Sequence, residues 1–350
     1  MGARTVLHVG PDHREPGGMA HVIGSYLEAK VEPWRIEVLP SYSSKSRVRW
    51  LWRFVASAAV LAFTPRGRIG GVHMHASHRF DLVRTLVLLE LARLRRLPRI
   101  LTLHGAELMD DVRRRPRLVR ALLRRADVVT ALSPEVEQAA RGLGIERVVL
   151  LPNPVHLRPP PTRVADRTQV LFAGEIGRRK GVDVLVAAWP AVRDACPQLT
   201  LLLVGPVLEP DVIASLPEGA AYRGVLSRHE VAAALDASCL AVLPSRAEAM
   251  PMFVLEAMAA GVPVVGTPVG AVEAVVGDGG VVVPAGDAEA LAGAMVGAVR
   301  EPKRLDEMSR RAQQRIAGEF SSEIFERRVL ELYDATFKRL NDLDSAGIGA

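Results

Sequence analysis

The sequence is poor in cysteine, in aromatic residues and in long hydrophobic runs. Two cysteines in 350 residues exclude a disulfide framework and a cysteine-rich metal site. Aromatic residues make up 5% of the chain, which argues against the base-stacking surfaces of common RNA-binding modules. The longest uncharged apolar run of the first half, Phe54–Phe63, has ten residues, whereas a membrane-spanning helix needs about 20. The apolar run at the amino terminus ends in Pro11-Asp12-His13, so we expect no signal peptide.

Lysine is also scarce, and the charge is distributed unevenly along the chain. Five of the 45 cationic residues are lysines. Residues 1–155 contain 25 Lys and Arg against 14 Asp and Glu, whereas residues 156–350 contain 20 against 25. A basic half beside an acidic half favours an anionic partner for the first half, such as nucleic acid, a membrane surface or a phosphate group.

Short apolar runs alternate with longer amphipathic stretches along most of the chain. This alternation is typical of the α/β class, with parallel sheets covered by helices on both faces. The expected helices include Val182–Asp194, Glu230–Ala237 and Ala288–Val299. The expected strands are Thr5–Val9, Ile69–Met74, Ile100–Leu103, Val128–Thr130, Val148–Leu151, Val170–Ala173, Thr200–Val204, Ala221–Gly224, Leu240–Leu243, Val262–Val265 and Val281–Val283.

A proline-rich segment, residues 152–161, interrupts this alternation. Proline cannot donate to the ladder of a central strand, so the segment is interpreted as a linker between domains. We therefore expect two doubly wound, Rossmann-like domains, residues 1–153 and 154–321, that face each other across a cleft. Such sheets bind ligands at the carboxyl ends of their strands, which favours a nucleotide-type ligand.

The strongest candidate site lies in residues 245–263. A strand ends at Pro244, a loop carries Glu248, and a helix begins near Pro251 and ends at Gly261. Glu256 is the single charge in this apolar helix, which is costly without a partner, so we expect it to accept hydrogen bonds from a ribose diol. Free backbone N–H groups around the start of this helix are expected to hold a diphosphate, and the residues expected to surround it are Met250, Pro251, Met252 and Phe253.

Three other positions carry suitable groups beside expected strands or helices. The Gly17-Gly18 turn follows a strand and precedes a helix, where its backbone can approach a phosphate, although a plain surface turn is the alternative. Lys180 ends a basic run just before a helix, and its ammonium suits the neutralisation of a diphosphate leaving group. His104 follows a strand at its carboxyl end, and a structural role is the alternative for this residue.

The chain resembles the family 4 retaining glycosyltransferases of GT-B architecture, also called glycosyl transferases group 1. The resemblance rests first on Glu248 and Glu256, separated by seven residues and followed by Ala-Met-Ala-Ala-Gly-Val-Pro. Its other motifs, which cover most of the chain in the family's order, are Pro16-Gly17-Gly18-Met19, His104-Gly105, Leu151-Pro152-Asn153-Pro154, Lys180-Gly181 and Val269-Gly270 followed by Glu273.

The resemblance implies transfer of a sugar from a UDP- or GDP-linked donor with retention of configuration and without an essential metal or cofactor. It implies catalytic roles for Lys180, Glu248 and His104. A departure from the family pattern is Glu175, which occupies the place of an expected phosphate-binding arginine, so Arg178 or another cation has to replace it. The base pocket is expected from Gly205, Val225 and Leu226. A carboxyl-terminal helix, about residues 322–343, is expected to pack back on the first domain.

His73 and His75 alternate along one expected strand, an arrangement that a metal pair would also show. Neither a carboxylate nor a third histidine lies at ligand spacing in the sequence, so we expect no metal. The acceptor is expected to contact the first domain around Gly18, His75, Ser77 and His104.

The expected reaction is hexosyl or N-acetylhexosaminyl transfer to a hydroxyl group, with a sugar or a polyprenyl-linked glycan as acceptor in exopolysaccharide or glycoconjugate assembly. Transfer to a small soluble acceptor in secondary metabolism is an alternative. A basic nucleic-acid-binding protein is the alternative of another class, although we expect no nucleic-acid partner. A Rossmann dehydrogenase is disfavoured because the first strand is not followed by GxGxxG.

The segment Arg47–Phe63 combines arginines with Trp50, Trp52 and Phe54. As a helix it would suit a membrane interface, with the arginines reaching lipid phosphates. An ordinary domain helix with its apolar face in the core is the alternative. The expected location is cytoplasmic. If the segment binds the membrane, the protein would lie at the inner face of the cytoplasmic membrane as a peripheral protein.

Overall fold

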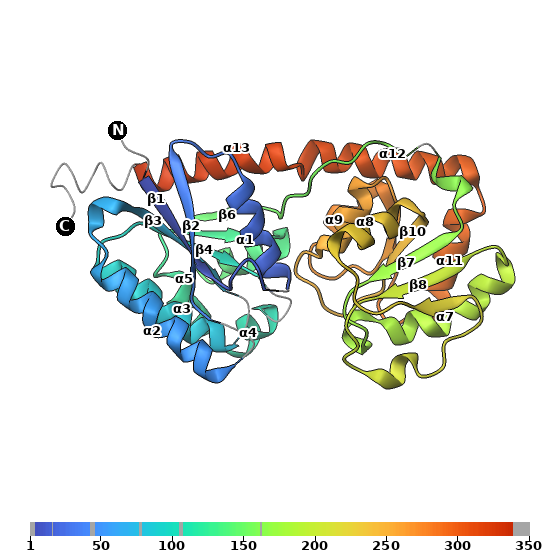
Figure 1. The fold of residues 1–350 in the computed structure, drawn as a ribbon, viewed down its shortest axis with the longest axis horizontal. Coiled ribbons are helices and arrows are strands. Elements are labelled where there is room, and N and C mark those ends of the chain that lie inside the picture. The colour runs from blue at the N-terminus through green and yellow to red at the C-terminus, as the bar shows by residue number, and fades with distance from the viewer. Residues whose placement is uncertain are drawn as a thin grey trace. The chain divides into compact units, whose positions relative to one another are not determined.

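The computed structural model describes residues 4–15, 17–42, 46–76, 79–104, 108–161 and 163–338. It divides into two compact units (Figure 1). Unit 1 combines Met1–Pro154 with Ser322–Ala350, and unit 2 is Val155–Ser321. Three residues named above lie outside the described residues: Pro16, Ser77 and Gly105.

Unit 1 contains a parallel six-stranded sheet with the order β2-β1-β3-β4-β5-β6. The strands are β1 (Arg4–Gly10), β2 (Trp34–Pro40), β3 (Ile69–Ala76), β4 (Arg99–Leu103), β5 (Val128–Ala131) and β6 (Val148–Leu150). The helices are α1 (Gly18–Glu28), α2 (Arg47–Phe63), α3 (Arg79–Leu94), α4 (Leu108–Arg114), α5 (Pro116–Leu123), α6 (Pro134–Gly142) and α13 (Ser322–Tyr333).

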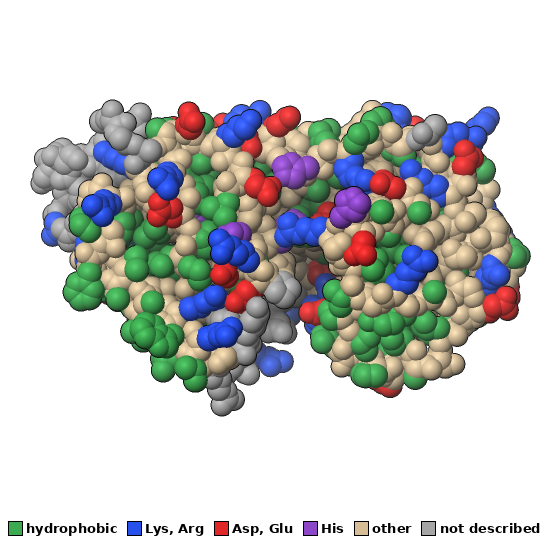
Figure 2. All heavy atoms as spheres, viewed as in Figure 1, with side chains coloured by type: hydrophobic (Ala, Val, Ile, Leu, Met, Phe, Trp, Pro, Cys, Tyr) green, Lys and Arg blue, Asp and Glu red, His purple; other side chains and the backbone are tan. Residues whose placement is uncertain are grey.

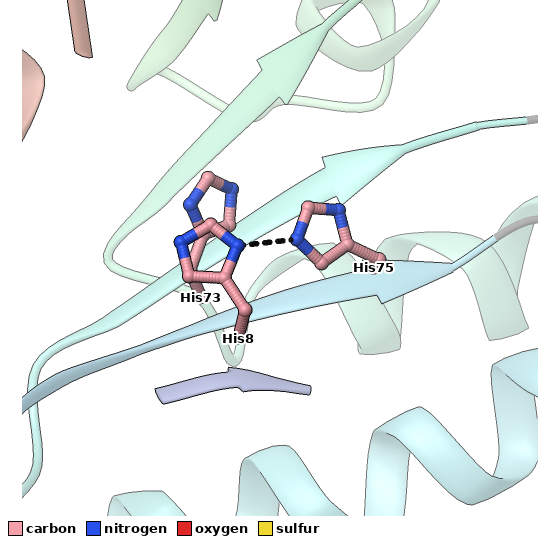
Figure 3. Close-up of side chains that lie close together, drawn as sticks. All are labelled: His8, His73 and His75. Atoms are coloured by element: carbon pink, nitrogen blue, oxygen red, sulfur yellow. Dashed lines mark hydrogen bonds between the residues drawn. The ribbon is translucent and has the colours of Figure 1, made fainter. Parts of the chain in front are cut away.

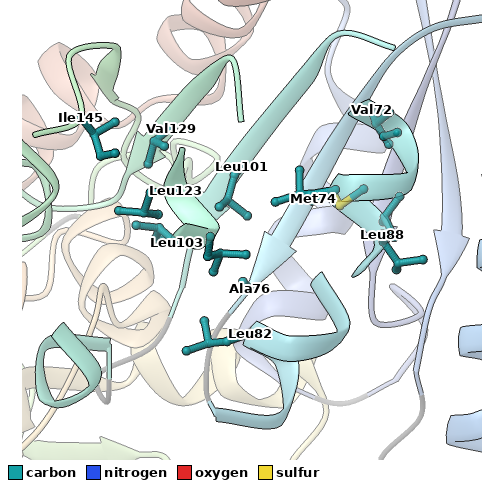
Figure 4. Packing of buried hydrophobic residues seen from close by; sticks show 14 of the residues in the cluster. Val72, Met74, Ala76, Leu82, Leu88, Leu101, Leu103, Leu123, Val129 and Ile145 are labelled. Carbon is teal, nitrogen blue, oxygen red and sulfur yellow. The ribbon is translucent and has the colours of Figure 1, made fainter. Parts of the chain in front are cut away.

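The two faces of this sheet differ in chemistry, because successive side chains of a strand point to opposite faces. Val72, Met74 and Ala76 of β3 point into the apolar core with Leu101 of β4 and Leu88 of α3 (Figure 4). His73 and His75 alternate with them and point to the other face, where they are fully buried. That second face is therefore both buried and polar.

The second face is covered in part by α13, the last described α-helix. Phe325 of α13 packs edge-on against Tyr26 of α1, with ring centroids 4.8 Å apart. Just beyond α13, Asp334 accepts a hydrogen bond of 2.9 Å from Nε1 of Trp34, and Phe337 packs over Gly71. The chain thus returns to unit 1 after it has formed unit 2.

Unit 2 contains a second parallel six-stranded sheet, with the order β12-β11-β10-β7-β8-β9. Its strands are β7 (Gln169–Ala173), β8 (Thr200–Val204), β9 (Ala220–Tyr222), β10 (Ser238–Leu243), β11 (Val264–Gly266) and β12 (Gly280–Val282). Its helices are α7 (Val182–Ala195), α8 (Arg228–Asp236), α9 (Met252–Ala259), α10 (Val272–Val276), α11 (Ala288–Val299) and α12 (Pro302–Glu319). The prediction of two doubly wound α/β sheets is confirmed.

The two ends of unit 2 lie together. Val155 forms a parallel β-bridge with Ser321, and its backbone N–H donates a hydrogen bond of 2.9 Å to the carbonyl of Phe320. The chain therefore enters and leaves unit 2 at one place.

One strand, β2, was not expected from the sequence. It is the edge strand of the first sheet, and Arg35 and Glu37 are exposed on it. An edge strand needs few apolar residues and tolerates a proline such as Pro40, so its sequence lacks the apolar run of a central strand. The other strands begin and end within two residues of the expected positions. No helix of the described chain is long and apolar enough to cross a lipid bilayer.

Candidate active site

In unit 2 the strand order reverses at β7, which pairs with β8 on one side and with β10 on the other. The carboxyl ends of such neighbouring strands form the usual ligand site of a doubly wound sheet. Lys180 follows β7, and Glu248 follows β10. Nζ of Lys180 lies 2.6 Å from Oε1 of Glu248, and the hydroxyl of Ser245 donates to the same oxygen at 2.6 Å. The fold thus joins two predicted catalytic residues that are distant in sequence.

Glycines allow the two loops to come this close. Gly181 has φ +71°, and a Cβ there would lie 1.8 Å from the carbonyl oxygen of Pro244. Gly270 has φ +58°, and its Cβ would lie 2.3 Å from the carbonyl oxygen of Glu248. Because only glycine fits these positions, the Lys-Gly and Val-Gly motifs have a structural reason.

The Lys180–Glu248 pair is largely shielded from solvent, with side-chain exposures of 15% and 7%. Removing one partner would leave the other charge partly buried and uncompensated, which is costly. A bound anion offers the ammonium an alternative partner. The ammonium of Lys180 can therefore leave Glu248 and pair with an anionic group, such as a diphosphate, at this edge of the sheet.

Helix α9 begins next to this pair. Pro251 is its amino-terminal cap, and the N–H groups of Met252 and Phe253 belong to the first turn, where no carbonyl of the helix can accept them. Met250 and Phe253 are buried, so the start of the helix is packed. These are the residues predicted to surround a diphosphate.

Glu256 lies further along α9 and is partly buried among apolar neighbours. Burial raises the pKa of its carboxyl, and the charge of Arg228 opposes this effect. Within the described chain no hydrogen bond or ion pair of another residue reaches this carboxylate. A carboxylate in this condition gains from a ligand that donates hydrogen bonds to it.

The residues predicted to bind the base lie at the carboxyl ends of β8 and β9. Gly205 has φ +134°, and a Cβ there would lie 1.8 Å from the carbonyl oxygen of Gly174. Its N–H donates a hydrogen bond of 2.8 Å to the carbonyl of Gly224, immediately before Val225 and Leu226. Backbone groups of three strand ends thus meet beside an exposed Val225.

The cations near Lys180 are held by acids. The guanidinium of Arg178 pairs with Glu209 at 2.5 Å and also with Asp211, and these two carboxylates raise its pKa. Arg179 pairs with Glu175, the acid at the place of the family's arginine. Arg179 also donates to the carbonyl of Ala247 at 3.4 Å, next to Glu248. Of the two arginines, it is therefore Arg179 whose guanidinium contacts the loop of Glu248, whereas the prediction named Arg178 or another cation.

The remaining predicted residues belong to unit 1. Gly17 caps α1 with φ +134°, and a Cβ at Gly17 or Gly18 would meet open space, so the backbone is accessible there. His104 follows β4 and is 5% exposed. Its Nε2 lies 2.9 Å from Nδ1 of His75, which fixes the ring from the interior of the sheet.

A third histidine, which does not lie at ligand spacing in the sequence, joins His73 and His75 in the fold. Nδ1 of His8, on β1, is 3.0 Å from Nε2 of His75, and the two rings point toward one another (Figure 3). The sequence hides this contact because it depends on the parallel pairing of β1 with β3, which places His8 opposite His73. One nitrogen of each ring lies within 4.8 Å of the others, as a metal site would require. All six ring nitrogens, however, already have hydrogen-bond partners in the protein, so the absence of a metal stays our prediction.

Comparison with known families gives a consistent result for both units. Residues 15–158 match the family described as Glycosyltransferase Family 4, and residues 167–301 match the family described as Glycosyl transferases group 1. These two matches lie in unit 1 and unit 2 respectively, apart from the last four residues of the first match.

Curated relatives match over part of their length. A glycogen synthase of Mycobacterium tuberculosis is 31% identical over 160 residues, which are 43% of this chain and 39% of that protein. A phosphatidyl-myo-inositol mannosyltransferase of Propionibacterium freudenreichii is 30% identical over 210 residues, which are 57% of this chain and 52% of that protein. The chain thus spans about half or less of the length of these relatives.

Solved structures show the same fold over nearly the whole chain. The sucrose-phosphate synthase of Thermosynechococcus elongatus has a TM-score of 0.77 at 21% identity, covering 95% of this chain and 98% of that one. HepE of Anabaena in complex with UDP has a TM-score of 0.74 at 16% identity, covering 95% of this chain and 100% of that one. Together with the motifs at Lys180, Glu248 and Glu256, these matches show that the chain belongs to the family 4 glycosyltransferases, glycosyl transferases group 1, with the GT-B fold.

Proposed function

We propose that this chain is a retaining glycosyltransferase that moves a hexosyl or N-acetylhexosaminyl group from a UDP- or GDP-linked donor to a hydroxyl acceptor. The observation that carries the proposal is the shielded Lys180–Glu248 pair where the strand order reverses, beside the start of α9. Support for a nucleotide ligand comes from HepE, which was solved with UDP and with UDP-glucose.

In the proposed reaction the diphosphate takes the ammonium of Lys180 and the first N–H groups of α9. Glu256 accepts hydrogen bonds from the ribose hydroxyls, and the backbone near Gly205 and Val225 holds the base. The bond between the anomeric carbon and the diphosphate oxygen breaks, and a bond from that carbon to the acceptor oxygen forms on the same face. The leaving diphosphate takes the acceptor's proton, and preorganised positive charge stabilises its departure.

Glu248 and His104 are proposed to act on the sugars rather than on the diphosphate. Once the diphosphate engages Lys180, the carboxylate of Glu248 can accept hydrogen bonds from the transferred sugar. His104 in unit 1 is proposed to contact the donor sugar or the acceptor, and Gly17 and Gly18 to approach the donor phosphate.

The test is a panel of nucleotide sugars, with hydrolysis and transfer followed by release of the nucleoside diphosphate. We expect activity with a UDP- or GDP-sugar that persists in excess EDTA, and nucleoside diphosphate binding that is weaker in Glu256→Gln. An EDTA-inactivated enzyme that magnesium restores would contradict the metal-free mechanism. Binding of an RNA oligomer without binding of any nucleoside diphosphate would instead support the nucleic-acid alternative.

The acceptor is proposed to be a lipid-linked glycan at the inner face of the cytoplasmic membrane, because α2 carries two apolar faces. Its inner face places Leu61, which is fully buried, and Phe54 against the core. Its outer face, here called the α2 outer face, consists of Val48, Leu51, Trp52, Val55 and Phe63, all exposed. Figure 2 shows hydrophobic side chains gathered on the surface over this helix.

The two described arginine side chains of α2 also differ in their surroundings. Arg49 is exposed, whereas Arg53 is held inward by Glu15 at 2.9 Å and by Asp12 at 3.3 Å. A surface with exposed tryptophan and phenylalanine beside arginine suits an anionic lipid interface. An acceptor that is small and soluble would leave this surface without a function.

A further inference from the structure

A chain of buried polar side chains runs through unit 1, on the face of the sheet that α1 and α13 cover. Its members come from four strands and from α13, and each is at most 5% exposed. Alternation along β3 and pairing between neighbouring strands place them side by side: His8 lies opposite His73, His75 opposite Thr102, and Thr102 opposite Thr130. This polar chain, here called the histidine chain, consists of His104, His75, His8, Tyr333, His73, Thr102 and Thr130.

The first half of the histidine chain leads from His104 to the carboxyl-terminal helix. Nε2 of His104 lies 2.9 Å from Nδ1 of His75. Nε2 of His75 lies 3.0 Å from Nδ1 of His8, and Nε2 of His8 lies 2.6 Å from the hydroxyl of Tyr333. His75 and His8 thus each use Nδ1 on the side of His104 and Nε2 on the side of Tyr333.

The second half leads from the same hydroxyl back into the sheet. The Tyr333 oxygen lies 3.2 Å from Nδ1 of His73, and Nε2 of His73 lies 2.6 Å from Oγ1 of Thr102. Oγ1 of Thr102 lies 2.5 Å from Oγ1 of Thr130. The Tyr333 hydroxyl therefore connects two rows of hydrogen-bonded side chains, one that ends at His8 and one that begins at His73.

The protonation of these rings is coupled. Burial lowers the pKa of His8, His73 and His75, and their mutual repulsion as cations lowers it further, so the rings are neutral. A neutral imidazole donates from one nitrogen and accepts at the other, and a hydroxyl donates one proton. The contacts among neutral rings of His104, His75 and His8 therefore allow two arrangements: all three carry the proton on Nδ1, or all three carry it on Nε2. His73 shares that tautomer when the Tyr333 hydroxyl accepts from one neighbouring ring and donates to the other.

We propose that His8, His75 and Tyr333 are positioning residues that hold His104 in a single tautomer and ring orientation. The inference rests on the proposed role of His104 at the sugar or the acceptor, because a ring that must donate or accept at a defined atom needs a defined tautomer. It gives the carboxyl-terminal helix a part in the reaction through Tyr333. His104 would be the catalytic member, and the others would act through it.

The test measures tautomers directly, by two-bond ¹H–¹⁵N correlation spectra of histidine-labelled protein, with assignment by single substitutions. In the unaltered chain we expect His8, His75 and His104 to show the same single tautomer, and His73 to show a single tautomer of its own. Tyr333→Phe should give a mixture at His8, His75 and His104 and lower kcat roughly tenfold, as loss of a supporting hydrogen bond does elsewhere. KM for the donor should stay within about twofold, since the donor groups of unit 2 are untouched.

Asp334→Ala is the matched control, because it removes the neighbouring hydrogen bond to Trp34 without touching the histidine chain. It should leave all four tautomers and kcat unchanged. His8→Phe keeps the ring volume and removes the link to His75, so it replaces Tyr333→Phe if that variant does not fold.

Mixed tautomers among His104, His75 and His8 of the unaltered chain would overturn the inference. So would an unchanged His104 tautomer in both Tyr333→Phe and His8→Phe. Because these spectra need no turnover, they are separate from the test of the proposed function. If the spectra show the expected tautomers but the protein transfers no sugar, the missing transfer contradicts the glycosyltransferase proposal. The tautomers would still support the hydrogen bonds of the histidine chain.

Discussion

Lys180 donates to Glu248 in the structure, and the same ammonium is proposed to neutralise the departing diphosphate. Lys180→Ala should therefore lower kcat/KM by about 10²–10³, the loss seen when one preorganised donor is removed from a developing charge. The measurement is steady-state kinetics with the preferred nucleotide sugar. The free energy of unfolding serves as a check that the fold survives.

Arg179→Ala and Arg178→Ala form the matched pair for this experiment. Arg179 reaches the loop of Glu248, whereas Arg178 is held by Glu209 and Asp211. We expect the larger loss of kcat/KM in Arg179→Ala. Wild-type kinetics in Lys180→Ala with a severe loss in Arg178→Ala would show that the charge was assigned to the wrong residue.

Glu256 is expected to strengthen donor binding and to lower the stability of the folded chain. Its pKa is raised by burial, so the folded chain disfavours the ionised form, and the charge destabilises the protein at neutral pH. Glu256→Gln should therefore raise Tm. It should also weaken donor binding roughly 10- to 150-fold, which corresponds to about 1.5–3 kcal/mol for charge-assisted hydrogen bonds. Calorimetric titration with the nucleoside diphosphate and a thermal melt measure the two effects, and unchanged binding would exclude the ribose role.

At the scale of elements, β1 and β3 make stability depend on pH. The pKa values of His8, His73 and His75 lie below the ordinary 6.5 in the folded chain, so the unfolded chain binds protons first as the pH falls. Their contribution to stability is complete above about pH 6.5 and declines below it, toward the lowered pKa values. Three rings give a slope of up to about 4 kcal/mol per pH unit.

Urea unfolding between pH 7.5 and pH 5 measures this slope. His8→Phe should make it shallower, because one of the three rings no longer titrates in the unfolded chain. Replacement of the exposed His229 by Asn is the control and should leave the slope close to that of the unaltered protein. Equal stability at both ends of the pH range would mean that the buried rings titrate normally.

Helix α2 offers a pair of aromatic residues with opposite environments. Trp52 is 70% exposed on the α2 outer face, whereas Phe54 packs against the core. Trp52→Ala should weaken binding to anionic vesicles at low salt and leave Tm unchanged. Phe54→Ala should lower Tm, because it opens a space in the core. Co-sedimentation with anionic and neutral vesicles measures binding, and indifference of the unaltered protein to anionic vesicles would favour a soluble acceptor.

The sequence predicts the elements of this fold better than it predicts the contacts between them. Central strands of a parallel sheet are short apolar runs, and these were recognised; the edge strand β2, with Arg35 and Glu37, was not. Separate motifs predict Lys180 and Glu248 as site residues, and nothing in the sequence shows that the two side chains are in contact. The contact depends on close loop approaches at Gly181 and Gly270. His8 was missed because strand pairing, not sequence spacing, brings it to His75.

At the scale of the whole molecule, the charge difference seen along the sequence persists in the fold. Unit 1 contains 29 Lys and Arg against 20 Asp and Glu, and unit 2 contains 16 against 19. A net positive unit attracts anionic surfaces over about a Debye length, an attraction that salt weakens. Apolar insertion through the α2 outer face would resist salt, so the salt dependence of vesicle binding separates the two contributions.

The bridge between Val155 and Ser321 makes unit 2 an insert within unit 1. Adjacent ends are the condition under which a domain can be excised or exchanged as a cassette. Residues 155–321 should fold as an independent fragment that retains nucleoside diphosphate binding. A short Gly-Ser splice from Pro154 to Ser322 should restore unit 1 with Tyr333 in place. Because unit 2 is proposed to bind the donor, the matching unit of a relative could then be grafted at this single junction to change the sugar, and unit 1 would stay unaltered.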